Sequence, residues 1–246
     1  MSERSARPGF VAASMAALGT VGLLVGFLLG IVTFGLVGTP LSVPIDSLPG
    51  QLVFTVGTYA GVAGVGAVYL LRYGLPLSYV RLRSPSVRDG LWTVATVVVL
   101  FGLAVAVSAL VTRLGLPIVE HNIGDSIRAN PAVGLAFVPI SLLLVGPAEE
   151  FLYRGIVQTR LGEPFDTNSA VAIAAVIFAA THVFAYLDPT NLAGTLVTLL
   201  VIVLPLGAIL GTVYEHTGNL LVPVLAHGCY NAITFGLSYV EAVGVV

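Results

Sequence analysis

Long apolar stretches recur along the whole chain, and their length is the feature that most constrains the fold. A helix needs about 20 apolar residues to cross the hydrocarbon core of a bilayer. Soluble domains average about 25% charged residues, whereas 9% of these 246 residues are charged and 57% are hydrophobic. Stretches of this kind occupy residues 10–37, 52–71, 91–111, 132–145, 170–186, 192–213 and 220–240. The pattern predicts an all-α, polytopic transmembrane helical bundle with seven or eight spans.

Two of these stretches are irregular and leave the number of spans open. The fourth is shorter than a span, so we expect it to continue through Glu149 to Arg160 as one longer helix with a polar end. Pro205 interrupts the sixth, and a proline inside a helix either kinks the helix or divides it. Division at Pro205 would give the eighth span.

The arginines predict how the chain is oriented in the cell membrane. The first apolar run is too long for a cleavable signal peptide, and positive residues favour cytoplasmic loops. In the seven-span layout Arg113 and Arg128 fall on one side. The other side holds Arg4, Arg7, Arg72, Arg81, Arg83, Arg88, Arg154 and Arg160. We therefore predict an integral membrane protein with a cytoplasmic N-terminus. The C-terminus is then outside with seven spans and cytoplasmic with eight.

A cluster of three charged residues lies in the fourth helix. Glu150 and Arg154 are four residues apart, so a helix places them on one face where they can pair. Glu149 projects about 100° away and is left to face other helices. Charges also gather at span ends for solvation, so a charged helix end at the membrane interface is the alternative.

Two further polar pairs share the same four-residue spacing. Phe178 and His182 lie on one face of the fifth stretch, with His182 well inside it. His227 and Asn231 lie one turn apart in the last stretch and can direct two hydrogen-bond donors to one point. Ionisable groups within a membrane are costly and usually functional, which favours convergence of the three clusters on one site.

The order Glu-Glu-x-x-x-Arg, Phe-x-x-x-His and His-x-x-x-Asn resembles the motif set of the CPBP family of intramembrane proteases. This family includes type II CAAX prenyl endopeptidases and bacteriocin-processing or immunity proteins. The resemblance covers about residues 141–235. It implies two parts, residues 1–130 with transmembrane helices and no matched motif, and residues 131–246 as the catalytic transmembrane core.

The resemblance also implies roles for individual residues. Glu149 would activate a water molecule with the help of His182, and His227 and Asn231 would stabilise the oxyanion. Glu150, Arg154 and Phe178 would support these groups. The implied activity is that of an integral-membrane endopeptidase acting within or at the membrane, including CAAX-type C-terminal processing. Lipid and a peptide or protein substrate, prenylated or not, are the implied partners.

The sequence leaves the cofactor and two other function classes open. Glu149, His182 and His227 could supply the ligands of a catalytic zinc ion, but the resemblance also supports a glutamate-type mechanism, and we favour the version without a metal. A proton-coupled transporter or a non-catalytic scaffold or immunity protein could use the same buried groups. The net charge of -2 and the lack of a basic surplus exclude nucleic acid as the expected partner. The oligomeric state and the natural substrate are not encoded in any motif.

Overall fold

The computed structural model describes residues 7–244, in which every regular element is a helix and there is no strand. Arg4, used above to predict the orientation, lies outside the described residues. The all-α class is therefore confirmed. The elements are α1 (Pro8–Thr33), η1 (Phe34–Gly38), α2 (Leu48–Tyr73), η2 (Leu77–Val80), α3 (Val87–Leu114), α4 (Ile123–Ala129), α5 (Ala132–Ile140), η3 (Ser141–Val145), α6 (Gly146–Glu150), η4 (Phe151–Gln158), α7 (Thr159–Leu161), α8 (Thr167–Thr181), α9 (Val183–Tyr186), α10 (Leu192–Thr198), η5 (Leu199–Val203), α11 (Leu204–Thr217) and α12 (Leu221–Ala242).

Five helices of the described chain are long and apolar enough to cross a membrane. They are Pro8–Gly38, Leu48–Tyr73, Val87–Leu114, Ala132–Leu161 and Leu192–Thr217. The count of seven or eight spans is not confirmed. The predicted fifth span breaks at His182, which leaves α8 with 15 residues. The last helix, α12, has 22 residues, but polar residues such as His227 and Asn231 reduce its hydropathy.

Two of the five long helices contain a π-helical segment one residue before a proline that lies inside the same helix. The segment η3 ends just before Gly146 and Pro147, and η5 ends just before Leu204 and Pro205. Both helices continue beyond the proline, so Pro205 does not divide its helix. The expected continuation of the fourth helix beyond Glu149 is confirmed, because it runs without interruption from Ala132 to Leu161.

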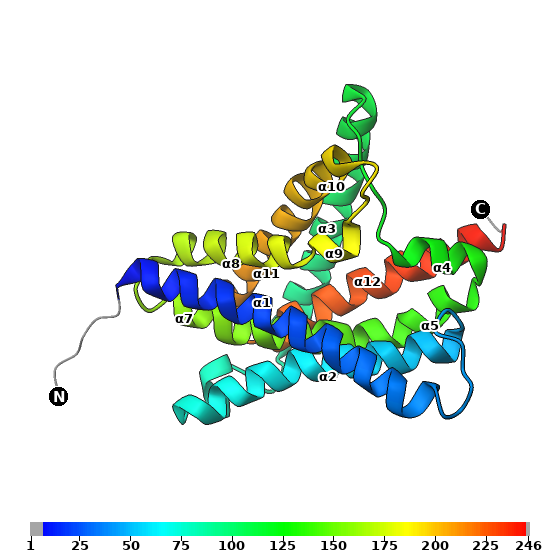
Figure 1. Cartoon of the computed structure of the whole chain (residues 1–246). Coiled ribbons are helices and arrows are strands. Elements are labelled where there is room, and N and C mark those ends of the chain that lie inside the picture. The colour runs from blue at the N-terminus through cyan, green and yellow to red at the C-terminus, as the bar shows by residue number, and fades with distance from the viewer. Residues whose placement is uncertain (1–6, 245–246) are drawn as a thin grey trace.

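Glycines allow the first two helices to pack closely as an antiparallel pair (Figure 1). A Cβ atom added at Gly61 would lie 2.7 Å from the Cα atom of Gly26, and one added at Gly26 would lie 2.9 Å from the carbonyl oxygen of Thr58. Small residues at a helix interface permit this close approach of the two backbones. The pair also contacts the Ala132–Leu161 helix, and α12 packs on the α5, η3 and α6 segments of that helix and on α3.

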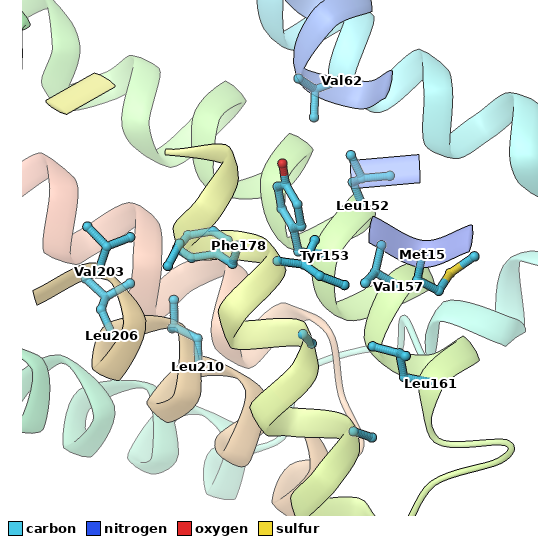
Figure 2. Close-up of a cluster of buried hydrophobic side chains, with 14 of the residues drawn as sticks. Met15, Val62, Leu152, Tyr153, Val157, Leu161, Phe178, Val203, Leu206 and Leu210 are labelled. Carbon is cyan, nitrogen blue, oxygen red and sulfur yellow. The ribbon is translucent and has the colours of Figure 1, made fainter. Parts of the chain in front are cut away.

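The main apolar core connects the N-terminal pair to the later helices. Figure 2 shows side chains from α1, α2, the Ala132–Leu161 helix, α8 and the Leu192–Thr217 helix gathered in one cluster. Its buried members include Met15, Val62, Leu152, Tyr153, Val157, Leu161, Phe178, Val203, Leu206 and Leu210. Residues of both predicted parts, 1–130 and 131–246, therefore share one core.

Candidate active site

Helix lengths bring Glu149 and His182 to the same level of the bundle. Glu149 lies about 18 Å from the Leu161 end of its helix, at a rise of 1.5 Å per residue. The chain turns there and enters α8, along which His182 lies about 22 Å from Thr167. His182 caps the end of α8 and does not lie within the helix as predicted, because the helix breaks at this residue before α9 begins.

Glu150 and Arg154 form the predicted ion pair, and both side chains are buried. Arg154 Nη1 donates to Glu150 Oε1 at 3.0 Å, and Nη2 donates to the carbonyl oxygen of Gly207 at 3.0 Å. The guanidinium also lies over the ring of Phe178, 4.3 Å from its centroid. Arg154 is 1% exposed and Glu150 is fully buried. The alternative of a charged helix end at the interface is therefore wrong, and Arg154 does not count as a loop arginine.

The two histidines of the motifs are held in the same way, each through Nδ1. The Nδ1 atom of His182 lies 2.8 Å from the carbonyl oxygen of Phe178, and that of His227 lies 2.8 Å from Glu150 Oε1. A carbonyl or carboxylate oxygen can only accept, so each Nδ1 carries the proton and donates. In the neutral form of either ring, Nε2 then presents a lone pair.

Glu149 occupies the space between the two rings. Its Oε2 atom lies 3.6 Å from His182 Nε2 and 3.9 Å from His227 Nε2. The residue is 8% exposed, and Oε2 has no hydrogen-bond partner among the described residues. Buried polar atoms are nearly always hydrogen-bonded, and exceptions concentrate at functional positions. Oε2 of Glu150 also lacks a partner among the described residues, but of these two carboxylates only that of Glu149 borders the cavity and faces both rings.

The four residues predicted to be catalytic line one cavity of about 230 Å³. Glu149, His182, His227 and Asn231 all border it, together with Phe178. Asn231 makes no hydrogen bond to another described side chain, but it lies one turn beyond His227 as expected. The convergence of the three clusters on one site is therefore observed.

Comparison with known proteins gives the family of this segment. The family model of the type II CAAX prenyl endopeptidase Rce1-like proteins matches residues 131–233. Residues 131–233 are similar to the Rce1-like proteins, and this segment is called the Rce1-like domain below. All seven residues named from the motifs fall inside this match, and the family agrees with the resemblance described above.

A shorter segment of the chain also matches a relative of uncharacterized function. A segment of 91 residues is 38% identical to the uncharacterized protein YpbD of Bacillus subtilis (strain 168). The aligned segment covers 37% of this chain and 40% of that protein, so the chain spans less than half of the relative it matches. No solved structure matches the chain.

Residues outside the Rce1-like domain also line the cavity, and the motifs did not reveal them. Tyr59 of α2 lies close to Glu149, and His121, before α4, lies near both Glu149 and His182. Tyr59 stands between the packing glycines Gly57 and Gly61, a pattern that indicates only close helices. His121 is one of only four histidines in the chain, and this rarity is the one sequence feature that could have marked it as a candidate site residue.

The cavity contains side chains of the chemical types that bind zinc. A catalytic zinc takes three protein ligands at about 2.0–2.2 Å. Glu149, His182 and His227 are of the right chemical types, but no group of three His, Cys, Asp or Glu side chains among the described residues is placed to hold a metal ion.

Proposed function

We propose that this protein is an integral-membrane endopeptidase that hydrolyses a peptide bond within or at the membrane. The observation that carries the proposal is the buried carboxylate of Glu149, which faces the Nε2 atoms of two histidines in one cavity of the Rce1-like domain. Buried carboxylates and imidazoles in a membrane bundle are expensive to maintain, so their convergence supports a chemical role.

In the proposed reaction Glu149 and His182 activate a water molecule together. Since Nδ1 of His182 donates to a carbonyl oxygen, the neutral ring offers a lone pair at Nε2. Water would donate one hydrogen bond to this lone pair and lose its other proton to Glu149 as its oxygen attacks the peptide carbonyl carbon. General-base catalysis of this kind contributes about 10²- to 10⁴-fold.

His227 and Asn231 would stabilise the oxyanion that forms on the attacked carbonyl. Because Nδ1 of His227 donates to Glu150, a second proton on the ring is required before Nε2 can also donate. His227 therefore acts as an imidazolium, and Glu150 stabilises its charge. The tetrahedral intermediate collapses when the carbon–nitrogen bond breaks and the leaving nitrogen takes the proton from Glu149.

We propose that this reaction needs no metal ion. The support is the arrangement of the donors, since no three ligand side chains of the described residues are placed to share one ion. Zinc bound by Glu149, His182 and His227 is the alternative, in which the ion would polarise the carbonyl and lower the pKa of its water.

The proposed substrate is a peptide or protein chain presented at the membrane, including prenylated C-terminal CAAX segments. The family of residues 131–233 supports this class. We also propose the cell membrane as the location, with the N-terminus in the cytoplasm. A substrate must release its backbone hydrogen bonds to be cleaved, which requires polar groups inside the cavity, and Glu149 and Asn231 are two of them.

The test is cleavage of quenched fluorescent peptides, prenylated and unprenylated, by purified wild type and by Glu149→Gln, each with and without a chelator. Cleavage that resists the chelator and is lost in Glu149→Gln supports the proposal. Cleavage that the chelator abolishes and zinc restores would establish the zinc alternative. Proton flux in liposomes without cleavage of any peptide would instead indicate a transporter, and neither activity in folded protein would indicate a scaffold.

A further inference from the structure

A third histidine, His121, lines the same cavity without belonging to any motif. It lies between α3 and α4, outside the matched residues 131–233 and outside the five candidate spans. Its ring packs edge-to-face against Tyr186 at 5.1 Å and Phe235 at 6.2 Å between centroids. His121 therefore lies beside the proposed catalytic groups, although its segment of the chain contains none of those groups.

Hydrogen bonds fix the backbone on both sides of His121. Before it, the amide of Val119 donates to Thr198 Oγ1 at 3.0 Å, and the same hydroxyl donates to the Val119 carbonyl at 3.3 Å. After it, Asn122 donates from its amide to the Ala185 carbonyl at 2.9 Å and from Nδ2 to the Phe184 carbonyl at 2.8 Å. His121 is therefore held in place before any ligand binds.

One further hydrogen bond determines which nitrogen of His121 carries its proton. The amide of Ile123 donates to Nδ1 at 3.1 Å, so Nδ1 accepts and the neutral ring carries its proton on Nε2. Burial, with the nearby His182, lowers the pKa of His121 to about 4, although Glu149 opposes this shift. The ring is therefore neutral near pH 7, and its tautomer is opposite to that of the neutral rings of His182 and His227.

The Nε2–H group of His121 has no hydrogen-bond partner among the described residues, although the ring borders the cavity. A polar group that stays unpaired when a ligand fills its surroundings weakens the binding of that ligand. A peptide bound in an extended form brings carbonyl oxygens that also need donors. An anionic group would be repelled by Glu149, whereas an uncharged carbonyl would not.

We propose that His121 is a substrate-binding residue, whose Nε2–H group donates to a backbone carbonyl oxygen of the bound peptide near the scissile bond. This inference depends on the proposed endopeptidase function. It assigns a role in substrate recognition to a segment outside the Rce1-like domain.

Two variants, each of which reproduces one ring nitrogen of His121, separate a role in substrate binding from a role in folding. Asn at position 121 can place Oδ1 where Nδ1 lies and keep the bond from Ile123, but it cannot reach the position of Nε2. Gln can place an amide N–H group near the position of Nε2, but it lacks the acceptor for Ile123. For a peptide that wild type cleaves, we expect His121→Asn to raise KM about 10-fold, the equivalent of one hydrogen bond, with kcat changed less than about 2-fold. We expect His121→Gln to keep KM within about 3-fold of wild type.

Binding of the labelled, uncleaved peptide, measured by fluorescence anisotropy, gives the same comparison without turnover. If wild type cleaves nothing, the proposed function fails, and the anisotropy series still decides whether His121 binds a peptide. An unchanged Kd and KM in His121→Asn would overturn the inference. If His121→Asn does not fold, His121→Gln decides alone, because a wild-type KM supports the donor role and a raised KM contradicts it.

Discussion

His227 donates from Nδ1 to Oε1 of Glu150 at 2.8 Å, deep inside the bundle. The same carboxylate oxygen accepts a hydrogen bond from Arg154 at 3.0 Å. One buried oxygen therefore connects the ion pair to the ring that faces Glu149. The family resemblance implies a supporting role for Glu150 and Arg154. The contacts explain this role, because the ion pair orients the ring of His227.

Replacing Arg154 should destabilise the protein more than any surface arginine does. Removing one partner of a buried ion pair leaves an uncompensated charge and costs about 3–5 kcal/mol. Arg154→Met should therefore lower the thermal midpoint in detergent, whereas Arg72→Met, at an exposed position of α2, should leave it nearly unchanged. Equal midpoints for the two variants would show that the pair does not hold the helices together.

Replacing Glu149 should remove activity without lowering stability. Oε2 of Glu149 has no hydrogen-bond partner within residues 7–244, so an uncharged amide removes a poorly satisfied buried charge. We expect Glu149→Gln to lose about 10²- to 10⁴-fold in kcat, with a thermal midpoint equal to or above that of wild type. A lower midpoint together with the loss of activity would instead assign Glu149 a structural role.

Replacing Asn231 should reduce kcat with little change in KM. Loss of one oxyanion donor costs about 10²- to 10³-fold in kcat, or about 2.7–4 kcal/mol. Cys229→Ala on the same helix is the control, because Cys229 does not border the cavity. Steady-state kinetics on a cleaved peptide distinguish the two variants. A rise in KM alone for Asn231→Ala would indicate substrate binding in place of oxyanion stabilisation.

The close approach of α1 and α2 predicts a difference between two glycines of one helix. A Cβ atom at Gly61 meets the Gly26 backbone at 2.7 Å, whereas one at Gly64 has no neighbour within 4 Å. Overpacking of this kind costs about 1–3 kcal/mol. Gly61→Ala should therefore lower the thermal midpoint, and Gly64→Ala should not. The comparison fails if both variants melt like wild type.

Acid should destabilise the fold through His121. Its pKa is about 4 in the folded protein against 6.5 for an unperturbed histidine. Between these values the unfolded chain binds more protons, so the free energy of unfolding rises with pH across this range and the contribution is complete above pH 6.5. Thermal midpoints measured from pH 4 to 7.5 should increase more steeply for wild type than for His121→Asn. Parallel curves would show that His121 does not titrate in this way.

The sequence predicted which polar side chains lie together better than it predicted the number of spans. The spacing of Glu150 and Arg154, and of His227 and Asn231, is a local helical property that any helix preserves. The height of a helix end within the bundle is not a local property, because it depends on the lengths of the neighbouring helices. The break after α8 at His182, and the continuation of the fourth helix to Leu161, together bring His182 level with Glu149, and neither follows from apolar length alone.

The residues contributed by distant segments could not be predicted from the motifs. Tyr59 reaches the cavity because Gly26 and Gly61 let α1 and α2 pack tightly, and His121 reaches it because its loop is bonded to α9 and α10. The positions of both side chains depend on tertiary contacts between distant segments, and no residue spacing within a single sequence predicts such contacts. The division into residues 1–130 and 131–246 stays a prediction, although both parts contribute to the cavity.

The Glu150–Arg154 pair contributes no net charge, and this affects the charge balance of the proposed reaction. Two carboxylates, one guanidinium and one imidazolium sum to zero, so the cluster of Glu149, Glu150, Arg154 and protonated His227 is electrically neutral. When water attacks, the charge that leaves Glu149 reappears on the oxyanion beside His227, and the total is unchanged. Because the low-dielectric interior penalises any net charge, this arrangement lets the proposed hydrolysis proceed without moving an ion into or out of the membrane.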